Sequence, residues 1–240
     1  MGQVGVAAEE ASRLQAMGSR DNYPPAECWG ACLLALSQAE AGNLSDALAA
    51  AEHGVASAAS GFDRLMADLA LGMVLVAADD PAKGLSRLSD APWRTERIGA
   101  FYFAYAGDAA YGRGLVRGGQ IEEGTAWLED GMRWFDTLGN RRGKCLSMLG
   151  LLEAAAKTGD AAQARLWVER TTNEAARAGM RGVQAEAHLI AADVSEQIGD
   201  LATAMAENAA TQALVQPLGW LALEQRVNAQ ARRLESKKRS

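Results

Sequence analysis

The sequence predicts an all-α chain built as a right-handed superhelix of antiparallel helix hairpins with a repeat of about 40 residues. Three observations lead to this fold class: glycines recur at fixed intervals, small residues recur between them, and the composition favours helix. Ala fills about a fifth of the 240 residues, whereas the chain has only 5 Pro and few Ile. Such a balance favours α-helix and argues against a β-sandwich or a buried parallel sheet.

Glycines mark two series of turns. The first series is spaced by 40, 77, 40 and 40 residues, and Asp79-Asp80-Pro81 divides the long interval into 37 and 40; its members are Gly2, Gly42, Gly119, Gly159 and Gly199. The second series marks the other turn of each repeat and comprises Gly18, Gly61, Gly139, Gly179 and Gly219. We expect each glycine to end a helix in the left-handed conformation, which costs glycine least.

Small residues stand at matching places on both sides of the first turn. Five residues after it lie Ala7, Ala47, Gly84, Gly124, Ala164 and Ala204; seven residues before it lie Ala35, Gly72, Gly112, Leu152 and Ala192. Two helices that approach closely need small side chains where they cross. The pattern resembles tetratricopeptide-like repeats, with a period about six residues longer than the usual 34 and one exception at Leu152. HEAT or armadillo repeats, which share the longer period, are the alternative.

The turns divide the chain into alternating A and B helices. The A helices are expected at 25–41, 62–78, 95–118, 141–158 and 181–198, and the B helices at 3–17, 43–60, 81–90, 120–138, 160–178 and 200–216. All five prolines fit near helix ends. Residues 1–236 are predicted to form one domain, with a half-repeat at 1–18, a capping helix at 220–236 and a disordered basic tail at 237–240.

The first half-repeat begins directly on a B helix that carries apolar residues where a solenoid end needs a polar cap. Three interpretations stay open. The helix is short and irregular, or the chain derives from a longer protein, or the apolar face of residues 4–14 pairs with a second copy in a homodimer.

Two stretches carry a further resemblance. LVRGGQIEEGTAWLEDG, from Leu115 to Gly131, continues to Leu138-Gly139, and a second stretch runs from Thr158-Gly159-Asp160 through Ala178-Gly179. Both resemble the C-terminal helical repeats of large bacterial signalling proteins, in which a nucleotide cyclase or a LuxR-type helix-turn-helix output domain accompanies a signalling ATPase. The resemblance implies a regulatory binding module and transfers no catalytic residue.

The residues that could carry chemistry have structural explanations. The glycine-rich run Gly112 to Gly119 lacks the strand and the Lys-Ser/Thr of a phosphate loop. Cys28 and Cys32 share one helix face but have no nearby ligands to complete a zinc site, so we expect buried packing residues. His53 and His188 lie too far apart in a solenoid to cooperate. The sequence therefore predicts no enzyme activity, no metal and no cofactor.

Charge and targeting signals narrow the partners. Lys+Arg 24 against Asp+Glu 30 gives a net charge of −6, without the basic excess that binds nucleic acid or anionic lipid. No signal peptide, myristoylation motif or membrane-spanning run is found, and the odd number of cysteines, 3, fits a reducing compartment. We predict a cytoplasmic protein.

The predicted function is the binding of a protein or peptide along a concave face lined by A helices. On the helix before Gly119 this face carries Ala106, Ala109 and a cationic edge. The predicted groove runs from positive to negative charge along Tyr102, Arg113, Arg117, Arg142, Glu153, Lys157, Glu186 and Asp193. The alternative is a small-molecule effector-sensing domain that closes around its ligand, as part of a transcriptional or cyclase regulator.

Overall fold

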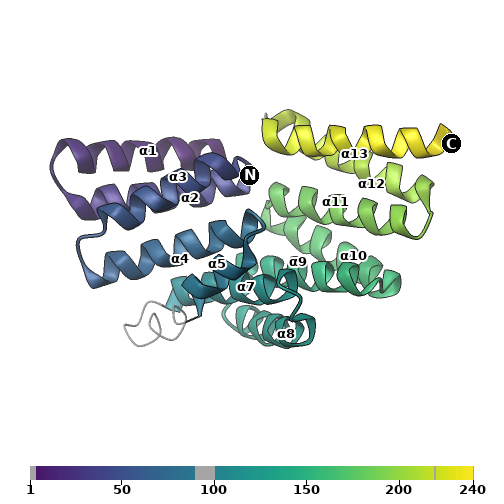
Figure 1. The fold of residues 1–240 in the computed structure, drawn as a ribbon, viewed down its shortest axis with the longest axis horizontal. Coiled ribbons are helices and arrows are strands. Elements are labelled where there is room, and N and C mark those ends of the chain that lie inside the picture. The colour runs from purple at the N-terminus through teal and green to yellow at the C-terminus, as the bar shows by residue number, and fades with distance from the viewer. Residues whose placement is uncertain (1–3, 90–100, 219, 240) are drawn as a thin grey trace. The chain divides into compact units, whose positions relative to one another are not determined.

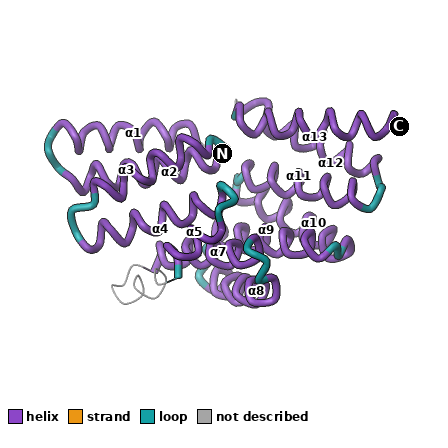
Figure 2. Tube along the Cα trace, viewed as in Figure 1, coloured by secondary structure: helices purple, strands orange, loops and turns teal. Residues whose placement is uncertain are grey.

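A computed structural model describes residues 4–89, 101–218 and 220–239 of the chain, and it describes the side chains of these residues except 101–106. Within these ranges the chain is α-helical, with no strand (Figures 1 and 2). The helices are α1 (Val4–Arg20), α2 (Pro24–Glu40), α3 (Leu44–Ser57), α4 (Gly61–Ala77), α5 (Pro81–Leu88), α7 (Phe101–Arg117), α8 (Ile121–Thr137), α9 (Arg141–Thr158), α10 (Ala161–Ala178), α11 (Arg181–Gln197), α12 (Leu201–Val215) and α13 (Leu221–Arg239), with a short 3-10 turn at Gln216–Leu218. The predicted fold class is confirmed.

The chain divides into two compact units, residues 4–124 and residues 125–239, where the sequence predicted one domain. The first is called the N-terminal unit and the second the C-terminal unit. In the N-terminal unit the A helices are α2, α4 and α7, and α4 contacts both of the others (Figure 1). In the C-terminal unit α9 and α11 are A helices, and α11 packs closely on α12.

Gly2 and Gly219 lie outside the described residues, and the other turn glycines follow the sequence prediction with two exceptions. Left-handed φ angles occur at Gly42, Gly119, Gly139, Gly159, Gly179 and Gly199, and Asp79 takes the same role with φ 63°. Gly18 and Gly61 were wrongly assigned: Gly18 lies inside α1, and Gly61 is the first residue of α4. Gly18 serves close packing instead, because a Cβ there would lie 2.2 Å from the backbone nitrogen of Glu27.

The small residues lie at the A–B crossings, as predicted. Ala164 and Ala204 are 2% and 0% exposed. A Cβ on Gly84 would meet Val76 Cγ2 at 2.6 Å and the carbonyl oxygen of Gly72 at 3.1 Å. Ala7 is the exception: it is exposed. The tetratricopeptide-like register therefore holds from α2 onwards, and it fails in the first half-repeat.

The first helix packs on the chain's own α2. Val4, Ala11 and Gly18 recur every seven residues and form its buried stripe, and a Cβ on Gly30 of α2 would lie 2.3 Å from the Gln15 backbone nitrogen. The first helix is therefore neither short nor irregular, since its 17 residues equal the length of α2, and Val6 stays 49% exposed. Pairing with a second copy remains a prediction.

The last helix extends further than the sequence predicted. Lys237, Lys238 and Arg239, expected in a disordered tail, form the last turn of α13. Basic residues stabilise the carboxyl end of a helix, and the Lys237 ammonium lies 2.8 Å from Glu196 Oε1 of α11. Cys28 and Cys32 are buried, as predicted, and so is Cys145, where burial raises the pKa of the thiol to about 11.

Candidate functional site

The turns give the A helices of the N-terminal unit a common register. Gly42, Asp79 and Gly119 end α2, α4 and α7 with left-handed φ angles of 83°, 63° and 91°. Residues counted back equally from these turns therefore occupy equivalent helix positions. Leu36, Met73 and Arg113 stand six residues before their turns.

A hollow lies between α2 and α4 at four such equivalent positions. From α2 it takes Trp29, Cys32, Leu33 and Leu36, and from α4 it takes the matching Met66, Leu69, Ala70 and Met73. None of these side chains is charged. We call this surface the apolar groove. Its volume is about 40 Å³, so it admits the end of a side chain rather than a whole small molecule.

The amino-terminal end of the apolar groove is held rigidly. The indole nitrogen of Trp29 donates to Asp63 Oδ1 at 3.0 Å, and the Trp29 ring lies 5.5 Å from that of Phe62. Asp63 also forms a capping box with Ser60 at the start of α4. Burial alone would raise the pKa of the Asp63 carboxyl, but hydrogen bonds from Ser60 and Trp29 outweigh burial and lower it. Asp63 therefore accepts from the indole as a carboxylate.

The outer edge of the apolar groove is open. Leu33 is 43% exposed and Phe62 is 40% exposed. Below them, Met66 and Leu69 join the core of the unit, on which Ala110 and Tyr111 of α7 also pack. The sequence analysis did not identify this site, although the repeat spacing carried the signal. Met73 lies 40 residues before Arg113, and Leu36 lies 37 residues before Met73, so both occupy the position equivalent to Arg113.

The predicted groove residues divide between the two units. Arg113 and Arg117 lie half-buried on α7, and the side chain of Tyr102 lies outside the described residues. The guanidinium of Arg117 donates to the carbonyl oxygens of Val76 at 2.7 Å and Ala77 at 3.4 Å. Arg117 therefore satisfies carbonyls at the end of α4, which is a structural role.

The remaining predicted residues belong to the C-terminal unit. Arg142 and Lys157 are exposed on α9, Glu153 is buried on the same helix, and Glu186 is half-buried on α11. Asp193 of α11 accepts from Gln230 Nε2 at 2.8 Å and from Arg233 at 2.5 Å. The chain's own α13 thus lies against this acidic residue.

Glu196, one turn beyond Asp193, is bound by the same helix. Arg233 donates to both of its carboxylate oxygens, with the shortest distance 2.7 Å. Hydrogen bonding from Arg233, with that from Lys237, holds the pKa of the Glu196 carboxyl below its ordinary value. Glu153 and Asp193 follow Arg113 at intervals of 40 residues, so the three residues occupy equivalent positions in their helices. At this position the A helices are apolar in α2 and α4 and charged further along the sequence.

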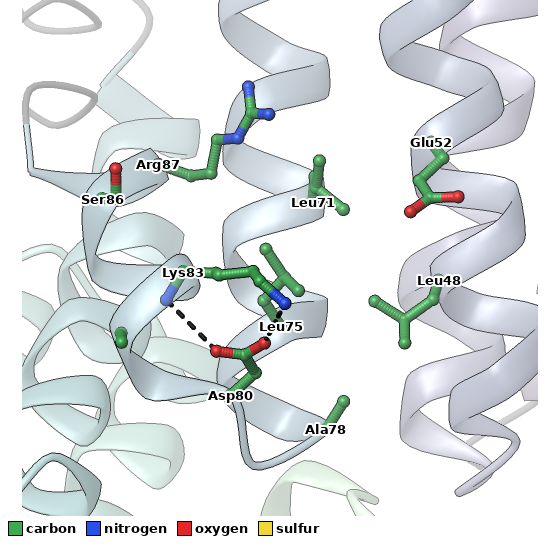
Figure 3. Close-up of a pocket in the computed structure, with 10 residues that line it drawn as sticks. Leu48, Glu52, Leu71, Leu75, Ala78, Asp80, Lys83, Ser86 and Arg87 are labelled. Carbon is green, nitrogen blue, oxygen red and sulfur yellow. Dashed lines mark hydrogen bonds and ion pairs between the residues drawn. The ribbon is translucent and has the colours of Figure 1, made fainter.

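A larger cleft lies between the B helices α3 and α5 (Figure 3). Leu71 and Leu75 of α4 and Leu48 of α3 give it an apolar floor, and its volume is about 770 Å³. Glu52 projects from α3, while Lys83 on the α5 side is paired with Asp80 at 2.8 Å. The cleft is open and mixes apolar and charged side chains.

One polar cluster has the residue types of a hydrolase. His53 Nε2 lies 2.9 Å from Glu27 Oε1 and 3.3 Å from Ser57 Oγ. A Ser-His-acid relay needs the carboxylate and the hydroxyl on different ring nitrogens, and here both contact Nε2. The cluster therefore links α2 to α3. In the described ranges, no group of three or more His, Cys, Asp or Glu side chains is placed to hold a metal ion.

None of the helices in residues 4–89, 101–218 and 220–239 combines the length and apolar character that crossing a bilayer requires.

No protein-family model matches the sequence, and no curated protein matches it. Among solved structures, the chain is similar to a Rap protein complexed with competence and sporulation factor, with 13% identity and a TM-score of 0.59 over 98% of this chain and 71% of that one. It is also similar to PilW, a widely conserved type IV pilus biogenesis factor, with 14% identity and a TM-score of 0.49 over 91% and 99% of the two chains. The fold is a tetratricopeptide-like helical repeat.

Proposed function

We propose that this chain is a non-catalytic binding module that holds an apolar segment of a protein or peptide partner on the A-helix face of its N-terminal unit. The observation that carries the proposal is the apolar groove between α2 and α4, whose lining residue Leu33 is 43% exposed; Phe62, which packs on Trp29, is 40% exposed. Large apolar side chains gathered at an open hollow are typical of protein interaction sites.

The dimensions of the apolar groove favour a peptide side chain. Pockets for drug-sized ligands occupy roughly 300–1,000 Å³, whereas this hollow measures about 40 Å³. A leucine, methionine or aromatic residue of a partner would place its tip among Leu33, Leu36 and Met73. Methionines suit such a surface because their flexible, polarisable side chains adapt to different partners.

The rigidity of Trp29 supports the same interpretation. Its indole is fixed by Asp63 and packed on Phe62 before any partner arrives. Binding therefore costs little side-chain entropy at this end of the apolar groove. Tryptophan is also among the residue types that contribute most binding energy at protein interfaces.

The broader role follows from the sequence. Resemblance to the helical repeats of bacterial signalling proteins supports a regulatory module that works in the cytoplasm beside a catalytic or DNA-binding output domain. In this proposal, the C-terminal unit offers polar contacts of its own to a partner through the accessible charged residues Arg142, Lys157 and Glu186.

The second candidate function is the sensing of a small molecule, and the cleft between α3 and α5 supports it. Its volume of about 770 Å³ lies within the range of ligand pockets, and its leucine floor suits an apolar body. A metabolite that raises the melting temperature of the native chain, and fails to raise that of Ser86→Trp, would support this function. Ser86 is chosen because it lines the cleft and is exposed.

Selection from a phage-displayed random dodecapeptide library tests the main proposal. Peptides enriched on the full chain are synthesised with a fluorophore, and their affinities are measured by anisotropy. We expect apolar anchors in the enriched peptides and at least a tenfold loss of affinity for Leu33→Asp, because a carboxylate in the apolar groove opposes burial of an apolar anchor. Leu166→Asp, a matched change at a 37% exposed leucine of α10, should bind normally. Equal affinities for native chain and Leu33→Asp would contradict the proposal.

A further inference from the structure

Resting on the proposed function, we propose that the bound segment carries a carboxylate about four residues from its apolar anchor, and that Arg113 of α7 receives this carboxylate. The apolar groove and Arg113 would then recognise two features of a partner in a fixed order. An apolar residue enters between α2 and α4, and an aspartate, a glutamate or a chain-terminal carboxylate reaches α7.

The order of the helices supplies the geometry. Helix α4 contacts α2 on one side and α7 on the other. Leu36, Met73 and Arg113 hold the same position in the three helices, so a segment that crosses the helices meets them in that order. Packed helices lie about 8–10 Å apart, which puts α7 roughly 12–15 Å from the middle of the apolar groove. An extended chain covers this distance in about four residues.

Small residues of α7 pack closely on α4. Ala109 is buried and Ala110 is half-buried, and a Cβ on Gly107 would lie 2.8 Å from Leu69 Cδ2. These small residues bring α7 close to α4, and Tyr111 of α7 packs on the same cluster as Met73. Ala110 also packs on the cluster that contains Met66 and Leu69, so the apolar surface continues from α4 to α7.

The positive charge of Arg113 would select the second feature, the carboxylate of the bound segment. At the four equivalent positions of α2, α4 and α7, Arg113 is the single charged residue in the sequence. A guanidinium presents five N–H donors in a planar fork, so Arg113 can bind a partner's carboxylate in addition to other acceptors. Arg117, one turn further along, donates to the carbonyls of Val76 and Ala77 and holds the end of α4. Arg113 is assigned the recognition of charge because of its position, which is equivalent to those of Leu36 and Met73.

The test is a change of selectivity. The same dodecapeptide library is selected on the full native chain, on Arg113→Glu and on Arg13→Glu. Arg13 is the matched control because it lies on α1, pairs with Glu10 and is largely exposed. We expect peptides from the native chain to combine an apolar anchor with Asp, Glu or a free carboxyl end three to five residues away. On Arg113→Glu, Lys or Arg should replace the acid, and native-selected peptides should bind about tenfold more weakly or worse.

The outcomes separate this inference from the function on which it rests. Apolar anchors without an acid preference, and equal affinities for native chain and Arg113→Glu, would overturn the role of Arg113 and leave the apolar groove as the binding site. Peptides that lack apolar anchors, or that ignore Leu33→Asp, would overturn both. A selectivity change with Arg13→Glu equal to that with Arg113→Glu would show a general charge effect and also overturn the inference.

Discussion

Replacing Gly84 by Ala tests the A–B crossing of α4 and α5 directly. The added Cβ would meet Val76 Cγ2 at 2.6 Å, Gly72 O at 3.1 Å and Val76 N at 3.1 Å. Two of these are backbone atoms, and Val76 is stiff because it is β-branched. The helices must therefore move apart. Overpacking of this kind costs about 1–3 kcal/mol, and the better helix propensity of Ala returns up to about 1 kcal/mol.

We therefore expect Gly84→Ala to destabilise the N-terminal unit by about 1–2 kcal/mol. Gly61→Ala is the matched control, because no atom lies within 4 Å of its added Cβ and its φ is not left-handed. Hydrogen exchange followed by mass spectrometry measures the effect locally, in peptides from α4 and α5. Faster exchange in Gly84→Ala, with Gly61→Ala unchanged, is the expected result. Equal protection in both variants would refute the close crossing.

Three further changes test other elements. Ala164→Leu should cost on the order of 1–3 kcal/mol, because Ala164 is buried in the core shared by α9, α10 and α11; an unchanged urea midpoint would contradict the repeat register. Gly159→Ala should cost about 1–2 kcal/mol in a thermal melt, since its φ of 72° is strained for any residue with a Cβ, and unchanged stability would mean that the turn is not left-handed. Glu196→Gln should flatten the loss of stability in acid: the lowered pKa of Glu196 gives a stabilisation that is present above the ordinary glutamate value and lost as the pH falls through the lowered one. Glu235→Gln, at an exposed pair with Arg239, should keep the native pH profile, and identical acid profiles for both variants would deny that Arg233 binds Glu196.

The repeat could be predicted from the sequence because its signals are local. A left-handed turn selects glycine, and a close helix crossing selects a small residue, so Gly119, Gly159 and Gly84 report their structural roles directly. Gly18 misled the prediction because glycine serves both purposes, and the tight approach of α1 to Glu27 is not visible in the spacing.

The candidate site was only partly predictable. The sequence analysis placed Arg113 on the concave face of α7, but it relied on charge and so extended the groove into the later repeats. There Asp193 and Glu196 are bound by Arg233, which lies 37 to 40 residues away in the sequence and which periodicity alone does not pair with them. The apolar groove went unnoticed because Leu36 and Met73 look like core residues until the structure shows that the hollow is open.

Methyl NMR of the methionines tests the central claim most directly. Met66 and Met73 lie in the apolar groove, whereas Met180 is buried in the core of the C-terminal unit. With [13C-methyl]methionine labelling and a library-selected peptide, we predict shifts at Met66 and Met73 that saturate with the affinity measured by anisotropy, while Met180 stays unchanged. Saturable peptide binding that leaves both Met66 and Met73 unshifted would contradict the account.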